Sequence, residues 1–164
     1  MILYIVRHAW AEEADETRWP DDGQRPLTDE GRKRFAKVVK TLADRGFAPS
    51  VVATSPLVRC RETAEILVRQ IPGKPKLVPR NELSPGSDLD KLLDWTASAA
   101  AGEKEIAWVG HAPDVGDLAA ALIGEGCVNI GFAKGAVAAI EFDGRPARRQ
   151  GELRWLVTAK ILGC

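Results

Sequence analysis

The sequence predicts an α/β protein: a three-layer α/β/α sandwich around a mostly parallel sheet with an antiparallel edge. Two observations predict this class. Short apolar runs of strand length alternate along the chain with longer segments in which apolar residues recur every three or four positions. The last two predicted strands follow one another with no helix between them. Alternating strands and helices favour a parallel sheet with helices on both faces, and the final pair of strands closes it with an antiparallel edge.

The first part of the chain predicts a strand, a long loop and a helix. Residues 2–6 (Ile-Leu-Tyr-Ile-Val) form a continuous apolar run, which is typical of a buried strand. Residues 9–27 are acidic and show no periodicity, and a loop of that length is usually functional or mobile. Thr28 can cap the helix that follows, and Gly46 can end it. The buried stripe of this helix is Phe35, Val38, Val39 and Leu42.

The rest of the chain repeats this alternation and ends in two strands. Residues 50–54 predict a buried strand, after which Ser55-Pro56 offers an N-cap with proline at the first helical position. The helix that follows buries Cys60, Ala64, Leu67 and Val68. The remaining predicted elements are a strand at 76–78, a loop at 81–87, a helix from near Asp88, a strand at 105–109, a helix at 113–122, and strands at 136–142 and 153–161 with a turn at Asp143-Gly144 between them.

Length and composition exclude several classes of protein. The 164 residues fit a single domain spanning 1–164, and a content of 45% apolar residues can fill its core. Because 23 basic residues balance 23 acidic ones, broad binding to nucleic acid or to a membrane is not expected. Three widely spaced cysteines make no disulfide framework, which favours a cytoplasmic location. The apolar opening at 1–6 is too short for a signal peptide or a membrane span.

Polar segments follow three of the predicted strands, and they contain both histidines of the chain. These segments are Arg7-His8, Ser55-Pro56 with Arg59, and Gly110-His111. In open α/β sheets, ligands bind beyond the carboxyl ends of the strands, so the three segments should meet at one edge. Each residue taken alone has an ordinary structural explanation. Two histidines and two arginines together predict a phosphate site, because arginine forks suit the oxygens of a phosphoryl group.

With these motifs the sequence resembles the histidine phosphatase superfamily, the phosphoglycerate mutase-like enzymes, over its whole length. The signature Arg-His-Gly of that family reads Arg7-His8-Ala9 here, with alanine in place of the common glycine. The element Ser-Pro-x-x-Arg-x-x-x-Thr-Ala matches residues 55–64, and Gly-His matches residues 110–111. The short length, with Arg-Pro-Leu-Thr at 25–28 and Glu-Leu-Ser-Pro at 82–85, is similar to small SixA-like phosphohistidine phosphatases. The resemblance implies a phosphoglycerate mutase-like fold.

The resemblance also implies how the site would work. His8 would be the nucleophile that accepts the phosphoryl group, and Arg7, Arg59 and His111 would bind the phosphate. Independently of any family, a neutral imidazole with an ordinary pKa of about 6.5 is a good nucleophile at neutral pH. The positive side chains would stabilise the charge on the transferred group. No metal and no other cofactor is therefore expected.

Three further roles follow from the resemblance with alternatives still open. Glu82 matches the segment that carries the general acid in larger members, and the alternative is a structural glutamate that caps or pairs. Arg25 would bind substrate or position the nucleophile loop, and a structural salt bridge is an equal alternative. Ser55 is a candidate for substrate binding. The fallback acids are Asp88, Glu12, Glu13, Asp15 and Glu16.

The stretches between the motifs are short, which leaves little material for a lid over the site. An open site favours phosphohistidine on a partner protein over a small phosphorylated substrate. The alternatives are a general small-molecule phosphomonoesterase and, because Ala9 replaces a glycine, a catalytically silent phosphate-binding adaptor. Neither nucleic acid nor a membrane is expected as a partner. Cys60 is interpreted as a small buried residue, because no histidine lies near it in the sequence.

Overall fold

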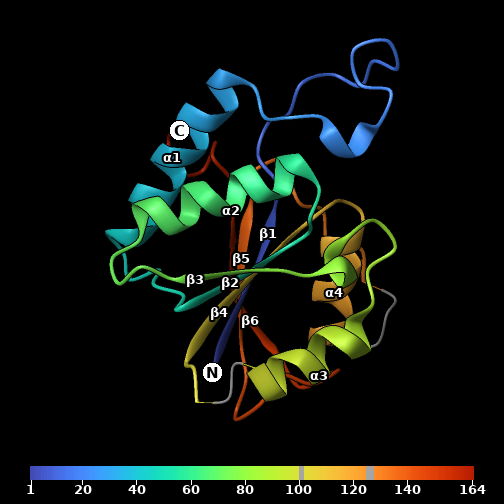
Figure 1. Ribbon diagram of the computed structural model, residues 1–164. Coiled ribbons are helices and arrows are strands. Elements are labelled where there is room, and N and C mark those ends of the chain that lie inside the picture. Colours follow the sequence, from blue (N-terminus) through green and yellow to red (C-terminus); the bar gives the residue numbers. More distant parts are fainter. Residues whose placement is uncertain (100–101, 125–127) are drawn as a thin grey trace.

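The computed structural model describes residues 1–99, 102–124 and 128–164, and these contain one six-stranded sheet (Figure 1). Its strand order is β3-β2-β4-β1-β5-β6. Neighbours are parallel from β3 to β1, whereas β5 runs antiparallel to both β1 and β6. The predicted mostly parallel sheet with an antiparallel edge is confirmed. The strands are β1 (Ile2–Arg7), β2 (Val51–Thr54), β3 (Lys76–Pro79), β4 (Glu105–Gly110), β5 (Val137–Glu141) and β6 (Glu152–Val157).

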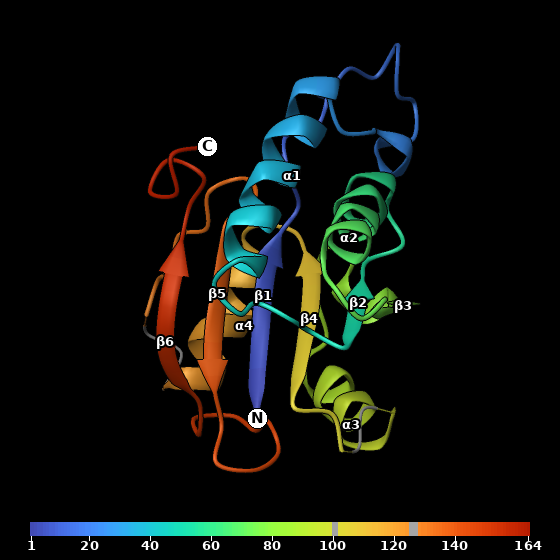
Figure 2. The ribbon, with the colours of Figure 1, turned by 90° about the vertical axis from the view of Figure 1, so that its left-hand side faces the viewer.

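In the described part of the chain, four α-helices cover the sheet in pairs, one pair on each face (Figure 2). The apolar stripes of α1 and α2 pack in one buried cluster with Tyr4 and Val6 of β1. Those of α3 and α4 pack with Leu3 and Ile5, because successive side chains of a strand point to opposite faces. The three layers predicted from the sequence are confirmed. The helices are α1 (Asp29–Ala43), α2 (Val58–Gln70), α3 (Leu89–Ala99) and α4 (Asp114–Ile123).

The register of the parallel strands fixes where the functional segments meet. Arg7, the last residue of β1, pairs with Gly110, the last residue of β4. Thr54, the last residue of β2, pairs with Val109, which also belongs to β4. The residues that leave these three strands therefore emerge side by side at one edge of the sheet. None of the described helices is both long enough and apolar enough to cross a membrane.

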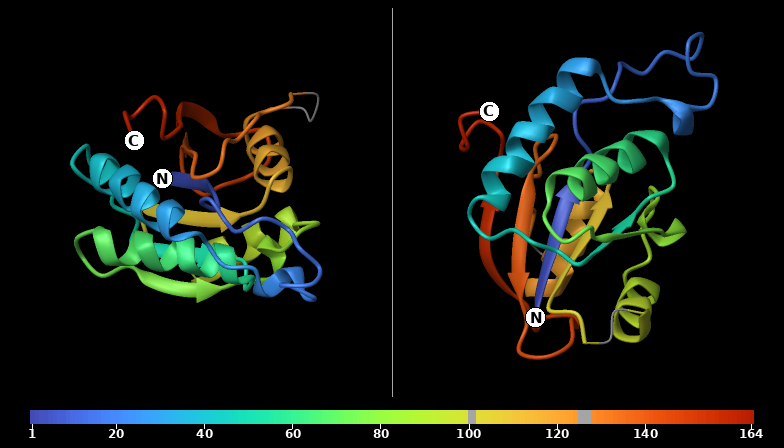
Figure 3. Two further views of the ribbon diagram at one scale, coloured as in Figure 1. Left: turned by 90° about the horizontal axis from the view of Figure 1, so that it is seen from above. Right: turned by 60° about the vertical axis from the view of Figure 1, so that its left-hand side comes forward.

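The long loop between β1 and α1 is closed at its base and folded beyond it (Figure 3). Ala11 and Leu27 form an antiparallel bridge, and the amide of Glu12 donates to the carbonyl of Pro26 (3.0 Å). The tip contains a short 3-10 helix, η1 (Asp22–Gln24), that contacts the N-terminal part of α2. The segment predicted as a loop is thus a loop with defined hydrogen bonds, and it places η1 at the edge of the sheet where the functional segments meet.

The last predicted strand is shorter than expected. β6 ends at Val157 instead of residue 161, because the amide of Leu162 turns back to the carbonyl of Thr158 (3.2 Å). The predicted turn at 143–144 is part of a longer connection, since β5 ends at Glu141 and β6 begins at Glu152. Cys127, the second of the three cysteines along the chain, lies outside the described residues.

Candidate active site

The carboxyl ends of β1 and β4 bring the two histidines of the chain together. His8 directly follows β1, and its amide donates to the carbonyl of Gly110 at the end of β4 (3.0 Å). The ring centroids of His8 and His111 are 5.4 Å apart, and both residues are buried. A Cβ atom on Gly110 would lie 3.2 Å from Val115 and 3.5 Å from the carbonyl oxygen of Leu83. A glycine before His111 therefore allows β4, α4 and the segment after β3 to pack closely around the site.

His8 is held as a neutral imidazole. Its Nδ1 lies 2.8 Å from the carbonyl oxygen of Ala9. Because a carbonyl only accepts hydrogen bonds, Nδ1 carries the proton and Nε2 keeps a lone pair. Burial lowers the pKa of His8 to about 3; the Ala9 hydrogen bond opposes this shift, and the positive charges of Arg59 and Arg7 reinforce it. At neutral pH the ring is uncharged, which is the state required of a nucleophile.

His111 rests against Ser55 and Cys60. Its Nε2 lies 2.9 Å from the Ser55 hydroxyl and 3.3 Å from the Cys60 sulfur. Burial lowers the pKa of His111 to about 4, and Arg59 acts in the same direction. Burial raises the pKa of the Cys60 thiol to about 12. The thiol is therefore protonated and packs beneath the site, as the sequence indicated, although a histidine does lie beside it in space.

Ser55 supports His111 instead of capping a helix. α2 begins only at Val58, and Leu57 at its N-cap position makes no side-chain cap bond. The predicted N-cap at Ser55, with Pro56 at the first helical position, is therefore wrong. The amide of Ser55 still donates to the carbonyl of Val109 (3.0 Å), so the chain remains extended there and cannot yet turn into a helix. This extension places the hydroxyl of Ser55 beside His111.

Two arginines line the same edge, and each keeps a buried N–H group without a partner. Nη1 of Arg7 donates to the carbonyl of Phe132 (2.6 Å), and Nη1 of Arg59 donates to the carbonyl of Asp22 (2.9 Å). Within the described residues, the Nε atoms of both arginines are buried and have no hydrogen-bond partner. Leaving a buried donor unpaired costs free energy, so such groups in a native protein need an explanation, such as an ordered water or a bound anion. At this edge, an anion is a candidate partner for both.

The side chain of Ala9 packs into the core. Ala9 is fully buried in the cluster between the sheet and the α1–α2 pair. Its amide donates to the hydroxyl oxygen of Thr63 (3.0 Å), and that hydroxyl donates to the carbonyl of Arg59 (2.7 Å). These bonds tie the segment after β1 to α2. The methyl group that replaces the hydrogen of the family glycine is therefore accommodated by apolar packing.

Arg25 reaches the site through Asp22, a residue that the sequence analysis missed. Nε of Arg25 donates to Oδ1 of Asp22 (2.7 Å), and its Nη1 donates to the carbonyl of Glu12 (2.8 Å). Oδ2 of Asp22 lies 3.1 Å from Nη1 of Arg59. The sequence analysis considered acids at 12–16 and stopped short of Asp22. The available signal was an Asp-Asp-Gly turn pattern at 21–23, two residues before Arg25.

Glu82 lies near the site, but its carboxylate is already paired. It belongs to a 3-10 helix, η2 (Asn81–Leu83), and its Oε1 lies 2.8 Å from Nη2 of Arg80. Arg80 follows β3 and lies over the ring of Trp95, 5.3 Å from its centroid. The amide of Arg80 donates to the carbonyl of Thr54 (2.8 Å), so this arginine also belongs to the functional edge. The sequence analysis missed Arg80 because β3 is short and weakly patterned.

The fallback acids lie on the surface, and three of them, Asp88, Glu12 and Asp15, have partners of their own. Asp88 is paired with Lys91 at 2.9 Å, and Glu12 is 3.5 Å from Arg18. The carboxylate of Asp15 accepts a hydrogen bond from the amide of Thr17 (2.8 Å). The remaining fallback acids, Glu13 and Glu16, are exposed. Asp22 is therefore the acid whose contacts with Arg59 the structure establishes.

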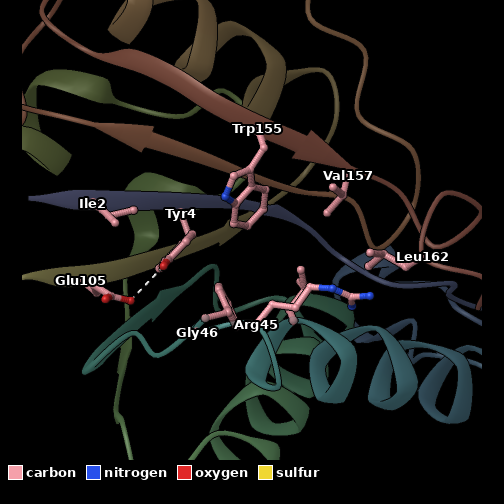
Figure 4. Close-up of a pocket in the computed structure, with 10 residues that line it drawn as sticks. Ile2, Tyr4, Arg45, Gly46, Glu105, Trp155, Val157 and Leu162 are labelled. Atoms are coloured by element: carbon pink, nitrogen blue, oxygen red, sulfur yellow. Dashed lines mark hydrogen bonds between the residues drawn. The ribbon is translucent and has the colours of Figure 1, made fainter.

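A separate cavity of about 470 Å³ lies at the opposite ends of β1 and β4 (Figure 4). Ile2, Tyr4 and Trp155 project into it from the sheet, and Gly46 lies at its side after α1. The Tyr4 hydroxyl donates to the carboxylate of Glu105 (2.8 Å). Neither histidine lines this cavity, so it is distinct from the edge that carries His8.

The sheet topology, the two helix layers and the edge that carries both histidines define a phosphoglycerate mutase-like α/β protein. More particularly, the chain belongs to the histidine phosphatase superfamily (branch 1), whose family model matches residues 3–120. An uncharacterized protein of Picosynechococcus sp. is 38% identical over 123 residues, which cover 74% of this chain and 73% of that protein.

Solved structures of the same class share this fold. The protein histidine phosphatase SixA in complex with tungstate matches with a TM-score of 0.84 and 23% identity, over 99% of both chains. The alpha-ribazole phosphatase from Shigella flexneri matches with a TM-score of 0.66 and 18% identity, over 97% of both chains. Phosphoglycerate mutase from Plasmodium falciparum matches with a TM-score of 0.60 and 19% identity, over 96% of this chain and 88% of that one.

Proposed function

We propose that the protein is a phosphatase that works through a phosphohistidine intermediate on His8. The observation that carries this proposal is the state of the His8 ring. The Ala9 carbonyl fixes the proton on Nδ1, burial keeps the ring neutral, and Nε2 retains the lone pair that attacks phosphorus. Membership of the histidine phosphatase superfamily agrees with this assignment.

The proposed reaction has two steps. In the first, the Nε2 lone pair of His8 forms a bond to phosphorus while the bond to the leaving group breaks. In the second, water attacks the phosphohistidine, phosphate departs, and the neutral imidazole returns. Arg7, Arg59 and His111 bind the phosphoryl oxygens, and the unpartnered Nε atoms of the two arginines are among the donors that this proposal assigns to them. The two arginines supply the positive charge that the reaction needs without a metal, and neutral His111 contributes hydrogen bonding.

The proposed substrate is a phosphohistidine carried by a partner protein. The short connections from β2 to α2 and from β4 to α4 support this choice, and the similarity in fold to SixA agrees with it. In this proposal the whole chain, residues 1–164, acts as one catalytic domain. The cytoplasmic location inferred from the cysteine content stays a prediction.

Two alternatives give different outcomes in the same assays. A general phosphomonoesterase would hydrolyse small phosphate esters as readily as phosphohistidine. A silent adaptor would bind phosphate without turnover. The burial of Ala9 in the core speaks against the adaptor, because its methyl group packs in the apolar cluster and its carbonyl still accepts the hydrogen bond from Nδ1 of His8.

The test is to trap the intermediate. Brief incubation with a radiolabelled aryl phosphate, followed by a denaturing quench, should leave one label on the protein, stable to base and labile to acid. His8→Asn should remain unlabelled, and a chelator should leave labelling of the native protein unchanged. A label that persists in His8→Asn would refute the assignment of the nucleophile.

A further inference from the structure

A carboxylate enters the arginine cluster from the loop between β1 and α1. Asp22 sits between two guanidinium groups, with Oδ1 2.7 Å from Nε of Arg25 and Oδ2 3.1 Å from Nη1 of Arg59. These contacts hold the pKa of Asp22 below its usual range, with the hydrogen bond from Arg25 as the main cause among those that lower it. Just over half of the Asp22 side chain (55%) is exposed. An ionised carboxylate therefore lies at the open side of the proposed phosphate site.

Anchoring the arginines does not by itself require this carboxylate. Nη1 of Arg59 already donates to the backbone carbonyl of Asp22 (2.9 Å), and Nη1 of Arg25 donates to the carbonyl of Glu12 (2.8 Å). A fixed negative charge beside an anion site weakens the binding of phosphate through repulsion. A site made only to hold phosphate would bind it better with a neutral residue in this place. The charge is explained if it acts on the part of the substrate beyond the phosphoryl group.

We propose that Asp22 is a specificity-determining residue that selects leaving groups bearing an N–H donor or a positive charge, as a phosphorylated imidazole does. One nitrogen of such a ring is bonded to phosphorus, and the other can carry a proton. The Asp22 carboxylate accepts a hydrogen bond from that second nitrogen and favours the protonated ring. Aryl and alkyl phosphates offer no such donor.

The chemistry of the step balances without any further reactant. Nε2 of His8 forms its bond to phosphorus, and the P–N bond of the substrate breaks with its electron pair passing to the leaving ring. Because the other ring nitrogen already holds a proton, the ring departs as neutral imidazole. Asp22 keeps the proton on that nitrogen and is itself unchanged. This inference rests on the proposed function, in which His8 receives the phosphoryl group.

The charged and titratable neighbours of Asp22 decide how pH should act. They are Arg25 from the same loop, Arg59 from α2 and, at longer range, His111, whose lowered pKa the charge of Asp22 opposes. His111, whose pKa is lowered to about 4, stays neutral throughout the neutral range. Between pH 6 and 9, the change in activity that depends on Asp22 should therefore follow the protonation of the substrate ring.

The experiment compares two substrates in matched variants. The kcat/KM of the native protein, Asp22→Asn and Asp22→Glu is measured between pH 6 and 9 with a phosphohistidine peptide and with an aryl phosphate. Glu16→Gln, an exposed acid of the same loop, is the control for loss of one negative charge. We expect the kcat/KM of Asp22→Asn for the phosphohistidine peptide at pH 8 to be lower than that of the native protein by about tenfold or more, as for loss of a hydrogen bond to a charged group. Aryl phosphate turnover should stay level or rise.

Three readouts separate selection from simple positioning. The alkaline limb of the phosphohistidine profile should move to lower pH in Asp22→Asn, and Asp22→Glu should restore it in part. Tungstate affinity should rise in Asp22→Asn, whereas a displaced Arg59 would lower it. Equal losses with both substrates, or weaker tungstate binding, would overturn the inference. Native protein that labels His8 from an aryl phosphate and ignores phosphohistidine would overturn it as well, while absence of any label on His8 would refute the proposed function instead.

Discussion

The two ends of β1 and β4 differ in whether the polar groups buried there have hydrogen-bond partners within the protein. At the amino end, the hydroxyl of Tyr4 is paired with the carboxylate of Glu105 beside a cavity of about 470 Å³. At the carboxyl end, two buried histidines have lowered pKa values, and Nε of Arg7 and of Arg59 lacks a partner among the described residues. The same strands thus carry one end that is satisfied within the protein and one end that is not.

This difference shows that a cavity by itself does not locate the proposed chemistry. The cavity at the amino end is lined mostly by apolar and aromatic side chains, and the buried Tyr4 hydroxyl on it is hydrogen-bonded to Glu105. A site for a small anion needs few atoms and many donors, so unsatisfied donors identify it better than volume. If that distinction is correct, changes at the carboxyl end should alter ligand binding and pH behaviour, and changes at the amino end should alter stability alone.

The largest effect should appear when acid protonates the buried histidines. The pKa values of His8 and His111, about 3 and about 4 in the folded protein, lie below the ordinary value of 6.5. The unfolded chain therefore binds more protons between these values, and stability is full above about pH 6.5 and falls as the pH drops. Each histidine contributes a slope of up to about 1.4 kcal/mol per pH unit.

Urea denaturation from pH 7 to 4.5 measures that slope. His8→Asn should reduce the slope of the unfolding free energy against pH by about the contribution of one histidine. The lowered pKa of Asp22 acts below its ordinary value of 3.8, which is outside this window. An unchanged slope in the variant would show that His8 does not gain its neutral state from burial.

The next largest effect should come from Arg59. Arg59→Ala removes a charged donor from the anion site, and a hydrogen bond to a charged group contributes about 1.5–3 kcal/mol. Tungstate affinity should therefore fall by about 10- to 150-fold. Arg61→Ala is the matched control, because Arg61 lies on the same helix with its side chain half exposed and 4.0 Å from Glu65. Calorimetric titration of both variants gives the comparison, and equal losses would contradict the assignment of the edge.

A smaller effect is expected at the amino end. Tyr4→Phe removes the hydroxyl that donates to Glu105 and leaves the ring packed against Phe47, whose centroid lies 4.5 Å away. The free energy of unfolding should fall by about 1 kcal/mol, as for one hydrogen bond. Turnover and tungstate affinity should match those of the native protein. A change in kcat larger than the change in folded fraction would show that the amino end influences the active site, and would contradict the expectation that changes there alter stability alone.

The smallest effect should be that of Glu82→Gln on a phosphohistidine substrate. A general acid is needed when an alkoxide leaves, where it contributes about 10²–10⁴-fold, and far less when a protonated ring leaves. The kcat/KM of the variant should therefore fall strongly with an alkyl phosphate and little with an aryl phosphate or a phosphohistidine peptide. A uniform loss across the three substrates would make Glu82 structural, as its bond to Arg80 suggests.

The sequence predicted the order of elements and the meeting of the histidines because both depend on local patterns. Apolar runs mark β1 and β4, and parallel strands end at one edge, so the positions of His8 and His111 followed directly. The start of α2 was wrong because Ser55 has two uses, and only its tertiary contact with His111 decides between them. The end of β6 was wrong because an apolar run does not reveal where the chain turns.

Asp22 escaped the sequence analysis for a related reason. Its role depends on how the loop between β1 and α1 folds back over α2, and a segment without periodicity carries no signal for that path. For Glu82, structural pairing was one of the alternatives, but the sequence did not identify Arg80 as its partner, because two neighbouring side chains of opposite charge need not meet. Local patterns therefore placed the nucleophile, whereas the charges around it required the structure.

The closed base of the loop between β1 and α1 has a consequence for how the protein can change over evolution. The bridge between Ala11 and Leu27, and the bond from the Leu27 amide to the carboxylate of Glu62 (2.7 Å), fix both ends of the loop whatever lies between them. Doubling the length of a flexible loop costs only about 0.6 kcal/mol in closure entropy. Mutation can therefore lengthen or recharge the segment at 13–20, before η1, and redirect the protein to new partners, while the nucleophile and the core are inherited intact.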